Sequence, residues 1–235
     1  MPSERSIEID VPMVGMTKAR AVYSELRRKI LTGELVPGHE VNQEGMAASL
    51  GVSITPLREA LRRLEMEGLV RLKAHRTVII PPLTREELVE LYVIRTELDA
   101  LATRLTAEVA SDEETALIAK LARQKAARDP VVQLELNRGF HRAIYSACGN
   151  TSLVTYLDQL WDRTDRYRLI LVKQEVGEGP VSAKDHIEIA DAIAARRAPR
   201  AGELMRDHIA RSRSRIAQAI ESPLDKHGNP FARKQ

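Results

Sequence analysis

The chain has 235 residues, of which 43% are hydrophobic and only 3% aromatic, so it can bury a sizeable core and is not expected to be disordered throughout. The formal net charge of +3 permits a nucleic-acid partner, and the single cysteine, Cys148, excludes an internal disulfide. Residues 1–15 lack the apolar core of a signal peptide, and no apolar run reaches the ~18 residues that span a bilayer. We therefore expect a cytoplasmic protein with no membrane partner.

The first 80 residues predict a small helical unit that closes with a β-hairpin. Thr17 offers a side-chain cap for a first helix, and Gly33 offers the left-handed residue that ends it. After Gly68 the hydrophobic period changes from that of a helix to that of short strands. In chain order we expect a flexible segment, three helices and two strands, at residues 1–16, 17–32, 43–50, 53–67, 69–72 and 77–80.

The third of these helices has two chemically different faces. Thr55, Arg58 and Arg62 share one side, with the two arginines one turn apart. The opposite side forms an apolar stripe of Leu57, Ala60, Leu61 and Leu64. A helix that reads DNA needs this division, because one face packs in the core while the other offers donors to the major groove. For a single arginine, a charged solvent face explains the position equally well, but the whole ordered set of elements favours a winged helix-turn-helix.

The sequence from Gly51 to Leu61, Gly-Val-Ser-Ile-Thr-Pro-Leu-Arg-Glu-Ala-Leu, resembles the core motif of the GntR family of bacterial repressors. The resemblance extends over residues 17–82, and eleven basic against seven acidic residues between positions 17 and 76 suit an anionic partner. It implies a DNA-binding domain over residues 17–80 that binds double-stranded operator DNA. A linker over residues 81–83, which contains two prolines, follows it.

The predicted DNA contacts come from the third helix and from the tip of the hairpin. The resemblance places Ser53, Thr55 and Arg58 at positions that contact DNA. The exposed face of the helix adds Arg62, and the predicted hairpin tip adds His75 and Arg76. The chain departs from the family pattern at Ile54, where an arginine is common, and at Thr77, where the wing has glycine. Because a β-branched residue tolerates positive φ poorly, we expect a differently shaped tip at Thr77.

From residue 84 onward the sequence shows only helical patterning. We expect six helices, at residues 84–110, 111–128, 131–147, 151–173, 182–197 and 200–220, followed by a disordered tail over 221–235. The predicted fold is therefore mainly α, with a winged helix-turn-helix that has a small β-hairpin wing, and an all-α six-helix bundle over residues 84–220.

Three of the six histidines, His141, His186 and His208, lie on three different helices of this bundle, and Asn137 precedes His141 by one turn. Imidazole nitrogens and an amide oxygen suit divalent transition metals. Spacing alone, however, does not bring three helices together, and each histidine taken singly is an ordinary surface or hydrogen-bonded residue.

The bundle is similar to the FCD-type ligand-binding domain of the FadR subfamily, in its VanR-like six-helix group. Metal-containing members carry Asp or Asn four residues before a histidine, and one histidine on each of the last two helices. Asn137, His141, His186 and His208 reproduce that layout. The resemblance implies a divalent metal, with zinc expected first and nickel, manganese or iron as alternatives. Because Asn137 is neutral where many relatives have Asp, weaker metal binding is expected.

Two further residues are candidates for effector binding. Arg95 lies at the place of an Arg-x-x-Leu-Glu motif in relatives, where it can anchor a small carboxylate, but an intrahelical pair with Asp99 explains it equally well. Tyr145, one turn beyond His141, either lines the cavity or packs in the core. The resulting prediction is a homodimeric, metabolite-responsive regulator, in which binding of a small-molecule effector changes operator affinity.

A metal-dependent enzyme that uses the three histidines is the alternative from another class. The sequence contains neither a His-Glu-x-x-His motif nor the Glu-x-x-His pair of di-iron bundles, which argues against it. A third possibility is a metal site of purely structural use, or no metal site, in a DNA-binding protein.

Overall fold

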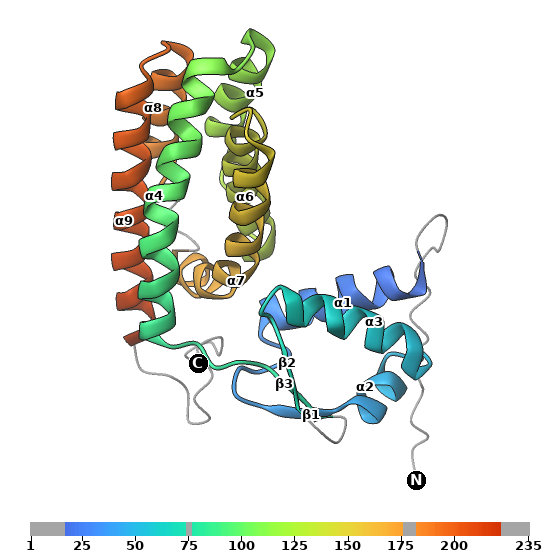
Figure 1. Cartoon of the computed structure of the whole chain (residues 1–235). Coiled ribbons are helices and arrows are strands. Elements are labelled where there is room, and N and C mark those ends of the chain that lie inside the picture. Colours follow the sequence, from blue (N-terminus) through green and yellow to red (C-terminus); the bar gives the residue numbers. More distant parts are fainter. Residues whose placement is uncertain (1–16, 74–76, 176–181, 222–235) are drawn as a thin grey trace. The chain divides into compact units, whose positions relative to one another are not determined.

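The computed structural model of the protein describes residues 17–73, 77–175 and 182–221 (Figure 1). The chain divides between Pro82 and Leu83 into two units, and each unit has its own hydrophobic core. The predicted flexible segment, the hairpin-tip residues His75 and Arg76, and the predicted tail beyond residue 221 lie outside the described residues.

The first unit contains three helices and a small antiparallel sheet, in the order α1 Lys18–Thr32, β1 Glu40–Asn42, α2 Gln43–Ser49, α3 Ile54–Met66, β2 Arg71–Lys73 and β3 Thr77–Ile79. The cap of α1 is as predicted, since the Thr17 side chain accepts a hydrogen bond from the Arg20 amide at 3.3 Å. Gly33 ends the helix with a φ of 79°, which an L side chain rarely adopts.

The hairpin prediction is incomplete, because the sheet has a third strand in the order β1-β3-β2. Val41 of β1 lies opposite Val78 of β3, so β1 covers the edge of the hairpin. The predicted first strand is also too long at its start. Leu69 and Val70 are buried in the core before β2 begins, and the Leu69 amide donates to the Leu64 carbonyl at the end of α3.

The second unit contains the helices α4 Arg85–Val109, α5 Asp112–Ala122, α6 Pro130–Ser146, α7 Thr151–Glu175, α8 Ser182–Ala194 and α9 Ala198–Glu221. The long helices α4 and α9 run side by side in opposite directions, and α6, α7 and α8 complete the wall of the bundle (Figure 1). The predicted fold class, a small helical unit with a β-hairpin followed by a helical bundle, is confirmed. No helix in the described ranges is long and apolar enough to cross a bilayer.

Two helix boundaries in the bundle differ from prediction. Helix α5 ends at Ala122 instead of residue 128, and the Ala127 amide donates to the side chain of Gln133 in the next helix, which holds this stretch out of a helical conformation. Pro199 does not break the chain, because it lies in the first turn of α9, where no amide donor is needed. The break lies at Arg196, which has a φ of 56°.

Candidate functional site

The outer face of α3 is an exposed polar surface in the first unit. Ser53, Thr55, Arg58 and Arg62 are all exposed, while the apolar stripe on the other side of the helix is buried. Ser53 is the N-cap residue but makes no side-chain cap hydrogen bond. Within the described residues, neither Arg58 nor Arg62 has a hydrogen-bond or ion-pair partner, so both guanidinium groups are available to a ligand.

A neighbouring arginine has a different role. The Arg63 guanidinium lies 3.9 Å from the centre of the Tyr23 ring in α1 and 3.1 Å from a carboxylate oxygen of Glu67. The Tyr23 hydroxyl donates to the same carboxylate at 2.8 Å. These contacts link α3 to α1 and hold the exposed face of α3 in one orientation.

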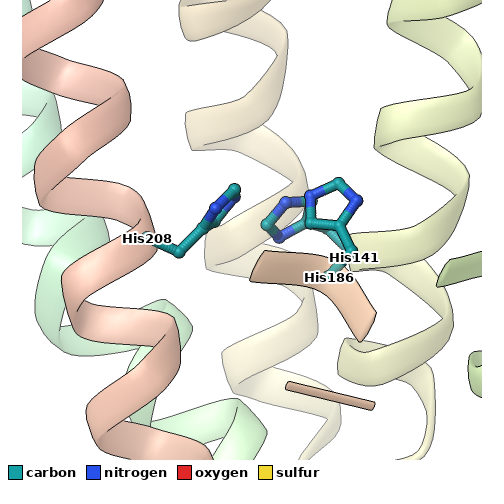
Figure 2. Close-up of side chains that lie close together, drawn as sticks. All are labelled: His141, His186 and His208. Atoms are coloured by element: carbon teal, nitrogen blue, oxygen red, sulfur yellow. The ribbon is translucent and has the colours of Figure 1, made fainter. Parts of the chain in front are cut away.

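In the second unit, three helices bring His141, His186 and His208 together (Figure 2). One ligand-type atom from each residue lies within 4.8 Å of those of the other two, and all three side chains are buried. The ring centres of His186 and His208 are 4.9 Å apart, and each lies 5.3 Å from that of His141. Phe140 stacks on His186 at 4.2 Å and fixes the orientation of that ring.

Each of these histidines has a buried Nε2 atom without a hydrogen-bond partner in the described part of the protein. The other ring nitrogen of His208 lies 3.1 Å from a carboxylate oxygen of Asp185, which is also held by Arg211 at 2.9 Å. Although partial burial acts in the opposite direction, the hydrogen bonds from His208 and Arg211 lower the pKa of Asp185 to about 2. An ionised Asp185 therefore accepts the Nδ1 proton of His208 and leaves the Nε2 lone pair unprotonated.

The histidine cluster is electrically neutral in the folded protein. Burial, followed by the charge of the neighbouring histidines, lowers the pKa of His141 well below its usual range. Burial, His208 and Arg168 act in the same direction on the pKa of His186. Neutral imidazole is the form that binds a metal ion, so no proton has to be displaced at neutral pH.

The cluster and its surroundings have buried nitrogen and oxygen atoms that suit a divalent cation. Asn137, one turn before His141 on α6, is 5% exposed, and neither its amide oxygen nor its amide nitrogen has a partner among the described residues. Buried polar atoms are normally hydrogen-bonded, so this concentration of unsatisfied nitrogen and oxygen atoms calls for a ligand. The three imidazoles suit zinc or a similar ion, and the amide oxygen of Asn137 stays the predicted fourth donor.

The two predicted effector residues lie together in a buried hydrogen-bond network. The Arg95 guanidinium binds both carboxylate oxygens of Asp99, at 3.0 and 3.3 Å, and the hydroxyl of Thr164 at 3.1 Å. The Tyr145 hydroxyl donates to Asp99 and accepts from Trp161 at 2.9 Å. Arg95 was predicted either to anchor a carboxylate effector or to pair with Asp99, and the structure contains the pair with Asp99. An effector that bound Arg95 would have to displace Asp99 from the guanidinium.

Sequence reasoning missed one buried charge beside the cluster. Arg168 of α7 is 4% exposed, and its Nε and Nη1 atoms have no hydrogen-bond partner among the described residues. Its guanidinium lies 5.2 Å from the centre of the Trp161 ring, and the His141 ring lies 4.9 Å from that ring. Helix α7 carries two other arginines, of which Arg163 is partly exposed and Arg166 is buried as well, and no local pattern in the sequence predicts which of the three is buried.

Replacement of Asp185 by asparagine is expected to weaken metal binding. The amide cannot hold the His208 proton as a carboxylate does, and loss of such a partner typically costs about 10- to 100-fold in metal affinity. Zinc competition with a fluorescent chelator measures the change. Asp191→Asn is the matched control, because Asp191 lies on the same helix but pairs with Arg123 at the surface. Equal zinc affinities of Asp185→Asn and the wild type would contradict the role of Asp185.

The metal-free protein is expected to lose stability below neutral pH. Because His141 and His186 have a lower pKa in the folded chain than the ordinary 6.5, the unfolded chain takes up more protons as the pH falls through 6.5. Stability is thus complete above about pH 7.5 and falls by up to about 1.4 kcal/mol per pH unit for each such proton. Urea unfolding between pH 8 and 5 tests this, and a His186→Gln variant should give a shallower slope.

Each of the two units matches a known protein family. The model of the family described as "Bacterial regulatory proteins, gntR family" matches residues 18–80, and the FCD domain model matches residues 90–211. The chain is 27% identical to the HTH-type transcriptional repressor GlaR of Escherichia coli over 209 residues, which cover 84% of this chain and 95% of that relative. It is 32% identical to the uncharacterized HTH-type transcriptional regulator YdhC of Bacillus subtilis over 60% of this chain, and it spans only 65% of that relative's length.

The fold also resembles that of a solved structure. Escherichia coli McbR/YncC superposes with a TM-score of 0.69 at 22% sequence identity, over 86% of this chain and 98% of that one. At this level of identity the similarity concerns the fold alone.

Proposed function

Because this chain belongs to the GntR family of bacterial regulatory proteins and carries an FCD domain, we propose that it is a metal-containing repressor controlled by a small carboxylate. The family and the relatives are regulators of transcription, not enzymes, so the metal-dependent enzyme is set aside as an explanation of the histidine cluster. The observation that carries the proposal is the set of three buried, unpartnered imidazole nitrogens in a domain of this class.

The first unit is proposed to bind operator DNA through the exposed face of α3. Arg58 and Arg62 offer guanidinium donors for guanine edges, and the N-terminal end of α3, with Ser53 and Thr55, offers donors for phosphate groups. His75 and Arg76 at the hairpin tip remain predicted contacts. The domain limits 17–80 and 84–220 are proposed as the DNA-binding and effector-binding parts of the chain.

The second unit is proposed to hold zinc, or nickel, manganese or iron, through His141, His186, His208 and Asn137. A bound divalent ion would supply positive charge and coordination positions that accept a carboxylate oxygen. The chain itself keeps the imidazoles neutral by burial and orients His208 through Asp185. In this proposal Arg95 and Tyr145 bind the effector by giving up hydrogen bonds to Asp99 and forming new ones to the effector.

The regulator is proposed to act as a homodimer. A palindromic operator presents two half-sites about 34–36 Å apart, and each protomer would fill one. The exposed face of α4 carries the apolar side chains Val89, Val93 and Ile94, which are 40%, 54% and 49% exposed and offer surface for self-association. Effector binding in the bundle would change the preferred spacing of the two α3 helices and thereby operator affinity.

The experiment that tests this proposal measures coupling between the two units. Operator affinity of the zinc-loaded protein is compared with and without small carboxylates, and again after removal of zinc by a chelator. We expect an effector to change operator affinity about 5- to 150-fold, as is typical of allosteric coupling. Operator affinity that responds to neither zinc nor any carboxylate would reduce the cluster to a structural role and refute metabolite control through it.

A further inference from the structure

Arg168 is a buried cation for which the described part of the protein provides no counterion. The side chain is 4% exposed, and its Nε and Nη1 atoms lack hydrogen-bond partners. Within the described residues, no carboxylate lies within ion-pair distance of its guanidinium. Arginine stays protonated in proteins, and an unpaired buried charge is costly. We therefore expect a negatively charged ligand to bind this guanidinium.

The position of Arg168 connects it with the histidine cluster. Its guanidinium lies against Trp161, which also contacts His141 and Arg95, at 4.9 and 4.2 Å from the ring centre. Arg168 and the cluster therefore belong to the same buried region.

The charges around this region are out of balance. Asp99 is neutralised by Arg95, and Asp185 is bound by His208 and Arg211. The predicted metal ligands are three neutral imidazoles and the neutral amide of Asn137. A divalent ion there would add two positive charges to that of Arg168, and among the described residues no carboxylate forms an ion pair with Arg168 to offset them. The region thus favours an anion from outside the chain.

We infer that Arg168 is the anion anchor of the effector site, and that its guanidinium binds the carboxylate of a small organic acid held beside the histidine cluster. The inference rests on the proposed function and refines it, because it assigns the charge contact to Arg168 rather than to Arg95. Each guanidinium nitrogen of Arg95 already donates to Asp99 or Thr164, whereas Nε and Nη1 of Arg168 have no partner among the described residues. The planar guanidinium matches a carboxylate in shape, and the Trp161 face supplies an apolar wall.

Anion titrations of the zinc-loaded full-length protein test this assignment. Acetate, malonate and succinate serve as probes, acetamide as the uncharged counterpart of acetate, and inorganic phosphate as the other oxyanion. Trp161 is the only tryptophan in the sequence, so its fluorescence reports on this region alone, and calorimetry supplies an independent readout. We expect at least one carboxylate to bind and Arg168→Gln to weaken it about 10- to 100-fold, as for loss of charge-assisted hydrogen bonds. Arg168→Lys should recover part of that loss.

The controls separate the anchor from the metal site and from general damage to the fold. Arg163→Gln removes a charge from the same helix at a residue that pairs with Glu87, and it should leave anion affinity unchanged. Zinc affinity should not fall in Arg168→Gln, because no metal ligand is altered and a positive charge near the cluster is removed. A second series on chelator-treated protein should retain the dependence on Arg168, since the guanidinium contact does not require the metal.

Four results would overturn the inference: equal carboxylate affinity in Arg168→Gln and the wild type, an equal loss in Arg163→Gln, binding of phosphate but of no carboxylate, or binding of no probe at all. Failure of the proposed metal site would be seen differently, as absence of zinc binding by the wild type in the zinc titration. The two failures are therefore distinguishable.

Discussion

Replacement of His141 by alanine is expected to lower zinc affinity more than about 100-fold, since loss of a direct ligand should exceed the 10- to 100-fold cost of losing an outer-shell partner. In the folded chain the Nε2 atom of His141 is buried and unpartnered, and one ring nitrogen of His141 lies within 4.8 Å of ligand-type atoms of the other two histidines. Zinc at 100 times its dissociation constant stabilises a folded protein by about 2.7 kcal/mol. For a chain of this size that corresponds to about 5–10 °C in melting temperature.

The measurement is a thermal melt with and without a chelator, combined with zinc analysis of the purified protein. The wild type should lose the full increment on chelation, whereas His141→Ala should melt at the same temperature in both conditions. His39→Ala is the matched control, because His39 is exposed and lies in the first unit. The comparison of the wild type with and without chelator needs no substitution, so it tests the metal site even if His141→Ala folds poorly. A wild type that melts identically with zinc and with chelator would contradict a metal site.

Replacement of Arg58 by alanine is expected to weaken operator binding about 5- to 150-fold. A bidentate arginine contact to guanine contributes about 1–3 kcal/mol of discrimination between bases, and Arg58 is exposed and has no partner within the described residues. The buried stripe of α3 is untouched by this change, so the fold should be retained. Fluorescence anisotropy at fixed salt, with the operator and with a scrambled duplex of equal length, measures the effect.

Arg104→Ala is the charge-matched control, because Arg104 is exposed and pairs with Glu108 in the second unit. It should leave operator affinity unchanged. A loss that is the same on operator and scrambled DNA would show that Arg58 contacts phosphate instead of bases. No loss on either duplex would remove Arg58 from the interface.

Local signals in the sequence were sufficient for most of the fold. Thr17 and Gly33 mark the ends of α1 because capping and positive φ are properties of single residues and their neighbours. The two faces of α3 could be predicted for a similar reason, since helical spacing alone separates its buried stripe from its exposed arginines. The three-residue strand β1 could not be predicted, because its formation depends on Val78, which lies far away in the sequence.

The candidate site was only partly predictable. The resemblance to metal-containing relatives grouped His141, His186 and His208, which spacing alone could not do, and the structure brings the three together. The partner of Arg95 could not be chosen from sequence, because Asp99 and a carboxylate ligand satisfy the same donors. The burial of Arg168 depends on how α7 packs in the bundle, and the surrounding residues of α7 do not reveal that packing.

In the proposed function this chain recognises a specific DNA sequence and couples that recognition to its helical bundle. The most direct test is binding of the full-length protein to DNA from upstream of its own gene, at one salt concentration, against an unrelated duplex of equal length. We predict binding at least about 1,000-fold tighter to the upstream DNA, as is typical of specific regulators. Equal affinity for both duplexes, with zinc and without it, would contradict sequence-specific recognition of this DNA by the protein.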